Sequence, residues 1–356
     1  MVKYIQTTSA KAIPYIREYP LVGSLPAFLG DRMKFLLCMA EKNDVYGFHI
    51  GLVPMILFNK PEHVQSILVE LADDFYKGQL MHKAFTGNGL FISEGEFHRR
   101  QRKLMAPAFQ PRQIANYVDS IAHYGEQIQQ KWNDGAVIDL NQQMIALTMS
   151  VIGKVVFDVD VFTETDELGA AWGIVFEYTT QILTSLFTPP LSWPTPRNRR
   201  FNKAVQLIEN RLQRMIDERR NSPHTRNDLL SILLRAKDED GSEMSDRQLM
   251  DECATLFAAG HETTAAALSW TWYLLCQHPG VYQKVQREVD EALKGRTPTA
   301  ADLPNLPYCL QVFKETMRLY PPASGILREA LHDIEIDGYL VPKGHNVLLS
   351  PYTLQR

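Results

Sequence analysis

The chain has 356 residues, 45% of them hydrophobic and 22% charged, and carries a formal net charge of -4. This is ordinary globular composition, and the slightly acidic balance excludes a general attraction to nucleic acid or to anionic lipid. The N-terminal region holds neither a signal-peptide core nor about 20 consecutive apolar residues, so we expect no transmembrane anchor. Widely spaced cysteines without a C-x-x-C motif indicate a reducing compartment, which predicts a cytoplasmic protein.

The N-terminal region combines short helices and strands. The expected elements are an extended lead-in at 14–26, helices at 31–43 and 61–71, and a hairpin of strands at 46–50 and 55–58. A glycine-rich loop follows at residues 75–96 and carries Phe85, Leu90 and Phe91. Apolar side chains on such a loop either cap a core or line a ligand pocket, and the residues alone leave both open.

A basic helix is expected after this loop, at residues 95–103. His98 and Arg102 lie four residues apart and share one face, whereas Arg99 and Lys103 share another. Such a run is ordinarily a solvated basic surface. The spacing nevertheless gives the helix two distinct cationic faces.

The middle of the chain is predicted to be almost entirely helical. Helical periodicity with few breakers extends over residues 111–132, 141–157, 167–187, 197–220 and 226–236, and no internal repeat is evident. A proline-rich segment at 188–196 interrupts this series and carries Leu191 and Trp193. It is either a rigid linker or a loop that guards a ligand entrance.

The longest helix is expected from about residue 246 to about residue 277. Ser245 stands three residues before Gln248, which fits a capping box, and no proline follows until Pro279. At 1.5 Å per residue such a helix is on the order of 50 Å long, enough to cross a whole domain. A helix of this length is usually central to a fold.

The middle of this helix departs from ordinary helix composition. Ala258, Ala259 and Gly260 remove bulk from one face, and Gly260 weakens the helix by roughly 1 kcal/mol. Glu262 and Thr263 place an acid and a hydroxyl where a core helix prefers leucine. The Thr263 hydroxyl can bond the carbonyl of Ala259, which opens a small groove for water or a diatomic ligand. The alternative is that the small residues serve close packing alone.

Two further helices, at 279–293 and 306–319, precede a region of short strands. Glu315 and Arg318 stand three residues apart among apolar side chains, so we expect a paired contact in apolar surroundings. Hairpin signals separate the strands, which are expected at residues 326–331, 334–336, 339–341 and 346–349. The sequence thus predicts a mainly α fold with small β-sheets.

Three segments together resemble the cytochrome P450 family, the haem-thiolate monooxygenases. They are residues 259–264, which spell A-G-H-E-T-T, the H-x-x-x-R pair of His98 and Arg102, and the E-x-x-R pair of Glu315 and Arg318 followed by L-Y-P-P. Any helix can carry an E-x-x-R by chance, so the agreement of the motifs is what counts. The resemblance covers nearly the whole chain and implies the cytochrome P450 fold, with one domain over residues 1–356.

The resemblance also implies which residues bind the cofactor, haem b, an iron protoporphyrin IX. His98, Arg102 and Arg328 match residues that hold the haem propionates in that family. Ala259 and Gly260 match the thinned part of the long helix against which the porphyrin lies.

The catalytic and substrate-binding residues follow from the same resemblance. Glu262 and Thr263 match the acid and alcohol that relay protons and hold water during oxygen activation, and Glu315 with Arg318 matches a structural pair. The implied substrate-pocket residues are Phe85, Leu90, Phe91, Ala258, Ala323, Ser324 and Gly325.

The implied activity is insertion of one atom of O2 into a C–H bond, or a C=C bond, of a lipophilic molecule such as a fatty acid, alkane or terpenoid. Electrons from NAD(P)H would arrive through a ferredoxin-type, flavodoxin-type or reductase partner, which would face Arg99, Arg100 and Lys103 of a monomer. One alternative is a haem-thiolate peroxygenase or isomerase without a reductase, although such relatives tend to lose the acid–alcohol pair. The other is a non-enzymatic helical ligand-binding protein that binds no haem.

Two metal-binding arrangements can be judged from the sequence. His261 and Glu262 begin like the zinc motif H-E-x-x-H, but Ala265 stands where the second imidazole is required, which excludes zinc here. In the family, iron is ligated by a cysteine in a glycine-rich loop, and none of the four cysteines of this chain has that context. We therefore expect a ligand beyond Arg356, a C-terminally incomplete fold, and no activity from these 356 residues alone.

Overall fold

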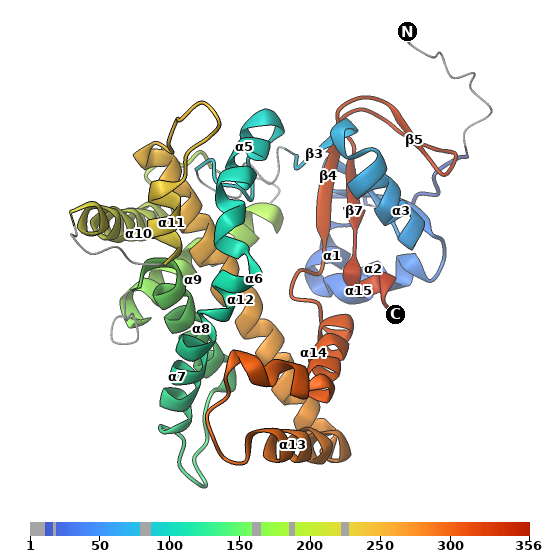
Figure 1. Cartoon of the computed structure of the whole chain (residues 1–356). Helices are drawn as coiled ribbons and strands as arrows, with labels where there is room; N and C mark the ends of the chain where they lie inside the picture. The colour runs from blue at the N-terminus through green and yellow to red at the C-terminus, as the bar shows by residue number, and fades with distance from the viewer. Residues whose placement is uncertain (1–10, 17–18, 79–86, 159–164, 185–188, 222–227) are drawn as a thin grey trace. The chain divides into compact units, whose positions relative to one another are not determined.

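A computed structural model describes residues 11–16, 19–78, 87–158, 165–184, 189–221 and 228–356. The chain forms two compact units, whose elements are labelled in Figure 1. The first unit comprises residues 1–86, 179–188 and 323–356, and the second comprises residues 87–178 and 189–322. The chain is mainly helical with small sheets, as predicted. None of the described helices is long and apolar enough to cross a membrane.

The first unit is built on a five-stranded mixed sheet of order β1-β2-β7-β4-β3, with β5 and β6 as a separate pair. The strands are β1 (Val45–Ile50), β2 (Val53–Phe58), β3 (Phe75–Tyr76), β4 (Ile326–Ala330), β5 (Ile334–Ile336), β6 (Tyr339–Val341) and β7 (Asn346–Leu349). The predicted hairpin is confirmed, since β1 and β2 pair antiparallel. β2 also pairs in parallel with β7, with Ile56 opposite Val347, so strands far apart in the sequence share one sheet.

Both faces of this sheet are covered by apolar side chains. Ile56, Phe58 and Val347 belong to one buried cluster. Leu57 and Leu348 belong to another. Because successive side chains of a strand point to opposite faces, the apolar runs at residues 55–58 of β2 and 347–349 of β7 are typical of strands buried on both sides.

The helices of the first unit include two that the sequence did not predict, at residues 25–30 and 351–354. The helices of this unit are α1 (Leu25–Gly30), α2 (Arg32–Ala40), α3 (Pro61–Gln65), which continues as a π-helical turn at Ser66–Glu70, and α15 (Pro351–Leu354). Pro26 stands in the first turn of α1, where the fixed φ of proline and its missing N–H favour a helix start. The extended lead-in predicted to residue 26 was therefore wrong at its end.

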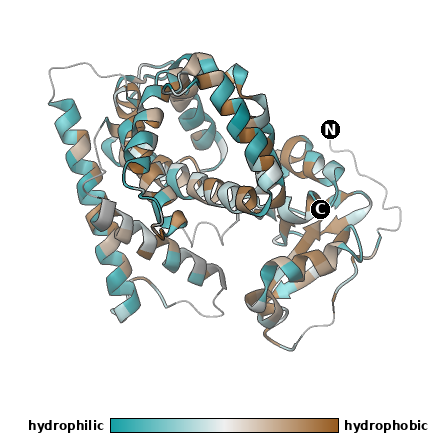
Figure 2. Cartoon of the chain, turned by 90° about the horizontal axis from the view of Figure 1, so that it is seen from below, coloured by the Kyte–Doolittle hydropathy of each residue, from teal (hydrophilic) through white to brown (hydrophobic). Residues whose placement is uncertain are grey.

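The second unit is helical and contains the larger part of α9. Its helices are α5 (Gly95–Met105), α6 (Pro111–Ala115), α7 (Val118–Gln129), α8 (Leu140–Phe157), α9 (Thr165–Thr184), α10 (Pro196–Arg220), α11 (Leu229–Arg235), α12 (Asp246–Gln277), α13 (Pro279–Leu293) and α14 (Pro307–Leu319). Several ribbons alternate between hydrophilic and hydrophobic colour along their length (Figure 2), as amphipathic helices do. The single helix predicted at 111–132 is divided between α6 and α7.

The predicted start of α12 is confirmed in part. The Ser245 hydroxyl caps the helix by accepting a hydrogen bond from the Gln248 N–H at 3.2 Å. The Gln248 side chain does not reach back to close the capping box. It lies against Glu252 instead, where its Nε2 donates to a buried carboxyl oxygen at 2.6 Å.

Helix α12 packs along α8 through small residues. The Thr148 hydroxyl of α8 donates to the carbonyl of His261 at 2.9 Å. A Cβ added to Gly260 would lie 2.5 Å from Cδ1 of Ile152, so this glycine allows the two helices to approach. Behind this contact, Phe257 lies in the buried cluster at ring-centroid distances of 6.2 Å from Phe157 and 5.7 Å from Trp172.

Candidate active site

The thinned middle of α12 presents one face to solvent. Ala259, Glu262 and Thr263 are exposed. His261 is only 3% exposed, and its Nδ1 bonds the carbonyl of Phe257 at 2.8 Å. The Thr263 hydroxyl donates to the carbonyl of Ala259 at 2.7 Å, which confirms the predicted contact. α12 is nevertheless continuous through this point, so the predicted groove does not interrupt the helix.

The pKa of the Glu262 carboxyl is changed by its surroundings, although the side chain is exposed. Partial desolvation by neighbouring protein atoms raises the pKa of Glu262 above its ordinary value. A carboxyl with a raised pKa is protonated more often near neutral pH than an ordinary glutamate. It is therefore better suited to deliver a proton to an adjacent group.

The small residues beside this face have a packing role. Ala258 is half-buried and contacts the main buried cluster of the second unit. Gly260 faces Ile152 of α8. The alternative of close packing therefore explains both residues in this unit, whereas contact of Gly260 with a cofactor and of Ala258 with a substrate stays a prediction.

A substitution at Gly260 tests how much its close contact with Ile152 contributes to stability. Gly260→Ala is expected to lower the free energy of unfolding by about 1 kcal/mol, because overpacking against Ile152 outweighs the gain in helix propensity. Ile152→Val removes the Cδ1 atom that the new methyl would meet, so the double variant should be more stable than the sum of the two single changes predicts. Denaturant unfolding of the three variants checks this. Strict additivity would contradict the packing role.

Helix α5 holds the predicted basic face. His98 is half-buried and Arg102 is exposed. In the described part of the chain, the Arg102 guanidinium has no hydrogen-bond or ion-pair partner. It is therefore available to an acidic group from outside the chain.

The other cations of α5 are paired within the second unit. Arg100 Nε donates to Asp238 Oδ2 at 2.6 Å, and Lys103 pairs with Glu239 of the same acidic turn. These contacts partly neutralise the surface that was predicted to face an electron donor. Docking of a partner there stays a prediction.

The residues predicted on the first unit lie on β4, which is placed between β7 and β3, and in the segment just before it. Arg328, on β4, is half-buried, and its Nη1 donates to the carbonyl of Leu327 at 2.8 Å. Ala323 and Gly325 are exposed, and the carbonyl of Ser324 accepts a hydrogen bond from the Ser350 hydroxyl at 3.1 Å. Whether Arg328 and Arg102 converge on one ligand stays a prediction.

The glycine-rich loop of residues 75–96 is described at residues 75–78 and 87–96. Leu90 packs against the main buried cluster, and Phe91 is 49% exposed. Phe85 lies outside the described residues. Phe91 is therefore better placed than Leu90 to contact a bound substrate, since the Leu90 side chain already packs against the core.

The Glu315–Arg318 pair forms, but its predicted surroundings were wrong. Arg318 Nε and Nη2 donate to the two carboxylate oxygens at 2.8 and 2.7 Å. The side chains are 55% and 43% exposed, because they point away from the apolar face of α14. The pair therefore contributes little by itself to stability. The hydrogen bond from Arg318 lowers the pKa of Glu315.

Two of the four thiols are poorly suited to ligate a metal. Burial raises the pKa of Cys253, and burial with a hydrogen bond to Glu288 raises the pKa of Cys309 to about 12. A metal binds the thiolate, which a raised pKa disfavours. Among the described residues, no group of three or more His, Cys, Asp or Glu side chains is placed to hold a metal ion.

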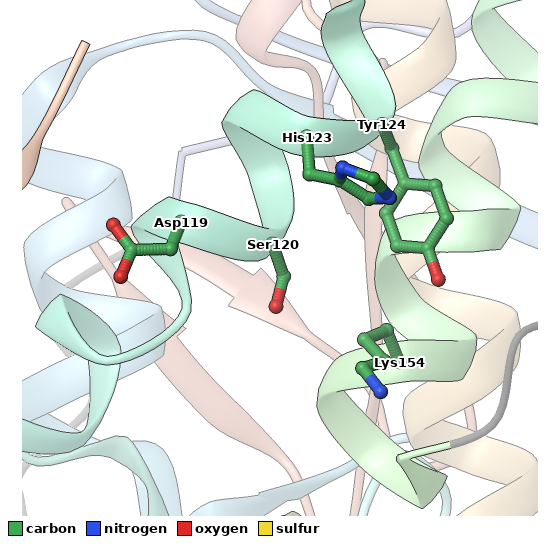
Figure 3. Close-up of a pocket in the computed structure, with 5 residues that line it drawn as sticks. All are labelled: Asp119, Ser120, His123, Tyr124 and Lys154. Carbon is green, nitrogen blue, oxygen red and sulfur yellow. The ribbon is translucent and has the colours of Figure 1, made fainter. Parts of the chain in front are cut away.

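A cavity of about 300 Å³ lies between α7 and α8 (Figure 3). It is lined by Asp119, Ser120, His123, Tyr124 and Lys154. Lys154 pairs with Asp158 at 2.5 Å, and His123 bonds Gln127 at 2.9 Å. No predicted site residue lines this cavity, so it is separate from the candidate active site.

These features define a class of protein: a mainly α enzyme with a mixed sheet, whose long helix bears an acid and an alcohol on an exposed face. The family model described as cytochrome P450 matches residues 13–356. The chain belongs to the cytochrome P450 family, whose members carry haem and use oxygen.

Individual relatives agree with this assignment. Cyclooctatin synthase of Streptomyces melanosporofaciens is 36% identical over 344 residues, which cover 95% of this chain and 74% of that protein. Pentalenene oxygenase of Streptomyces avermitilis is 30% identical, with 95% of this chain and 76% of that protein covered. The solved structure of retinoic acid bound cyanobacterial CYP120A1 has the same fold, with a TM-score of 0.85, 24% identity, and coverage of 98% of this chain and 79% of its own.

The sequence overlooked one pair of buried acids. Asp251 and Glu252 precede the thinned part of α12 and contact the glycine-rich loop. Two adjacent acids within an otherwise apolar helical stretch were the available signal, since buried carboxylates require specific partners.

Proposed function

We propose that this protein is a haem b monooxygenase that inserts one atom of O2 into a C–H or C=C bond of a lipophilic molecule of the terpenoid class. Family membership supports the cofactor and the reaction type. The substrate class is supported by relatives named pentalenene oxygenase and cyclooctat-9-en-7-ol 5-monooxygenase. The observation that carries the proposal is the exposed acid–alcohol pair, with Thr263 bound to the carbonyl of Ala259 at 2.7 Å.

The described residues fit a flat cofactor with acidic edges. Ala259 offers an exposed surface without bulk on α12, and Arg102 offers a guanidinium without a partner among the described residues. Arg102, His98 and Arg328 would hold the propionates, with Ala259 and Gly260 lining the ring. When bound, haem supplies the reduction of dioxygen and the transfer of one oxygen atom to the substrate.

The chain's own side chains would control protons and water at this place. The Thr263 hydroxyl hydrogen is directed to the carbonyl of Ala259, so its oxygen is free to accept a hydrogen bond from water. Glu262, with its raised pKa, would pass protons from solvent to that water. Phe91 and the residues predicted at 323–325 would exclude bulk water by contacting the apolar substrate.

We further propose one domain over residues 1–356 of a monomeric, cytoplasmic protein. Electrons from NAD(P)H would reach it through a ferredoxin-type, flavodoxin-type or reductase partner. Such a partner would face Arg99, Arg100 and Lys103 of α5, of which Arg100 and Lys103 also pair with Asp238 and Glu239.

The proposal is tested on the natural protein with two measurements. The reduced protein should give the red-shifted carbon monoxide band of thiolate-bound haem, and an O2-dependent hydroxylated product should form from a terpene when an electron donor is supplied. A colourless protein that binds terpenes would support the non-enzymatic alternative. Product formation from peroxide, with none from O2 and electrons, would support the peroxygenase alternative.

A further inference from the structure

Two adjacent carboxylates near the start of α12 are buried although neither belongs to the catalytic pair. Asp251 is 9% exposed and Glu252 is 0% exposed. Buried carboxylates persist only where hydrogen bonds or opposite charges stabilise them. Arg247 supplies one such charge, since its Nη2 lies 3.1 Å from Asp251 Oδ1.

Both carboxylates bind the backbone of the glycine-rich loop. The Asn88 N–H donates to Asp251 Oδ2 at 2.8 Å, and the Leu90 N–H donates to Glu252 Oε2 at 2.8 Å. Gln248 donates to the other oxygen of Glu252 at 2.6 Å and holds that carboxylate in place. Alternate residues of the loop are thus tied to adjacent residues of the helix, which fixes the position and the register of the loop.

Two glycines allow the loop to lie this close to α12. Gly87 has a φ of +85°, and a Cβ added to it would lie 2.7 Å from Asp251 Oδ1. A Cβ added to Gly89 would lie 2.1 Å from Thr255 Oγ1 and 2.7 Å from the Asp251 carbonyl oxygen. A side chain at either position would push the loop off the helix.

The anchored loop leads directly to the residues assigned to substrate and cofactor. Its next residue, Phe91, is 49% exposed, and Ser93 closes a turn by donating to the Gly89 carbonyl at 3.0 Å just before α5 begins. On α12 itself, Glu252 and Thr263 lie along one stripe of the helix, about 16 Å apart along its axis. The same helix therefore carries both the catalytic hydroxyl and the anchor of the loop.

We propose that Asp251 and Glu252 are positioning residues, which fix the loop of residues 87–93 at a set place along α12 and thereby determine the size of lipophilic substrate that the enzyme accepts. This inference rests on the proposed function, which makes Phe91 a substrate-facing residue. The two carboxylates act through the loop and do not touch the reacting atoms.

The anchoring is tested by hydrogen exchange on the natural protein. Glu252→Gln keeps the side-chain volume but removes the charged acceptor for the Leu90 N–H, so amide exchange in residues 87–93 should become faster by about tenfold or more. Exchange in α8 should not change. Glu243→Gln is the matched control, because Glu243 is 55% exposed and pairs with Lys237 at the surface. It should leave loop exchange unaltered.

The specificity role is tested by equilibrium binding of a sesquiterpene alcohol and a diterpene alcohol. Glu252→Gln should change the ratio of the two dissociation constants by about fivefold or more, and Glu243→Gln should not. Gly89→Ala displaces the loop while keeping both carboxylates, so it should change the same ratio. If the Glu252→Gln variant does not fold, as judged by loss of its helical circular dichroism, Asp251→Asn is used in its place for both measurements.

The outcomes separate the two proposals. Faster loop exchange with an unchanged affinity ratio would overturn the specificity role and leave the proposed function standing. Unchanged exchange in both Glu252→Gln and Gly89→Ala would overturn the anchoring itself. If the unmodified protein binds neither haem nor terpene alcohol, the proposed function fails and the specificity role fails with it, while the exchange rates still decide whether the carboxylates hold the loop.

Discussion

Replacing Thr263 with alanine is expected to lower the amount of oxygenated product formed per electron pair consumed by about tenfold to a hundredfold, with haem content unchanged. The Thr263 hydroxyl is held on the carbonyl of Ala259 at 2.7 Å, beside the Glu262 carboxyl with its raised pKa. Without that oxygen, water next to Glu262 loses its fixed acceptor, and protons are delivered at the wrong place. Product and consumed reductant, measured together in the natural protein, give the ratio.

A second threonine of the same helix provides the matched control. The Thr271 hydroxyl donates to the carbonyl of Ala267 at 2.8 Å, which is the same local bond two turns further along α12. Thr271→Ala should therefore leave the product ratio unchanged, and Thr263→Ser should restore most of it. Equal losses in Thr263→Ala and Thr271→Ala would show that the bond matters for helix stability alone.

Replacing Arg219 with alanine is expected to lower the free energy of unfolding of the second unit by about 3–5 kcal/mol, because it leaves a buried carboxylate without its cation. Arg219 and Asp228 are paired with side-chain exposures of 7% and 3%. The guanidinium also donates to the Phe157 carbonyl and to the Ser231 hydroxyl, each at 2.6 Å. One side chain thus joins the ends of α8 and α10 to the start of α11.

The neighbouring Arg220 provides a control for the Arg219 substitution within the same protein. Arg220 pairs with Asp246, but the two side chains are 43% and 52% exposed. Arg220→Ala should cost about 0–1 kcal/mol, since water screens and replaces an exposed ion pair. Denaturant unfolding of both variants measures the two losses in the free energy of unfolding. Similar losses for the two arginines would contradict the assignment of the buried pair as the stabilising contact.

Local signals predicted the long helix well. The serine cap at Ser245 and the proline at Pro279 bound α12 at Asp246–Gln277, because capping and helix-breaking act within a few residues of the chain. The Thr263 hydroxyl bond was likewise predictable from its spacing to Ala259. Periodicity was less reliable at 111–132, since an apolar pattern can persist across a turn such as the one between α6 and α7.

Contacts between distant residues were beyond such signals. The sequence left two explanations for Gly260, and Ile152 of α8 shows that packing requires the glycine. The apolar neighbours of Glu315 and Arg318 suggested burial, but both side chains leave the apolar face of their helix for solvent. The anchoring of residues 88 and 90 by Asp251 and Glu252 joins segments about 160 positions apart, and no local pattern marks it.

The sequence by itself determined most of the helices, the hairpins and the motif residues that relate this chain to the cytochrome P450 family, because caps, breakers and hydrophobic periods act over a few neighbouring residues. Only the tertiary structure decided that β2 pairs in parallel with β7, that Thr263 and Glu262 are exposed while His261 is buried, and that two acids of α12 hold a loop. The physical reason is that pairing, burial and desolvation depend on which distant side chains surround a residue, and those neighbours exist only once the chain has folded.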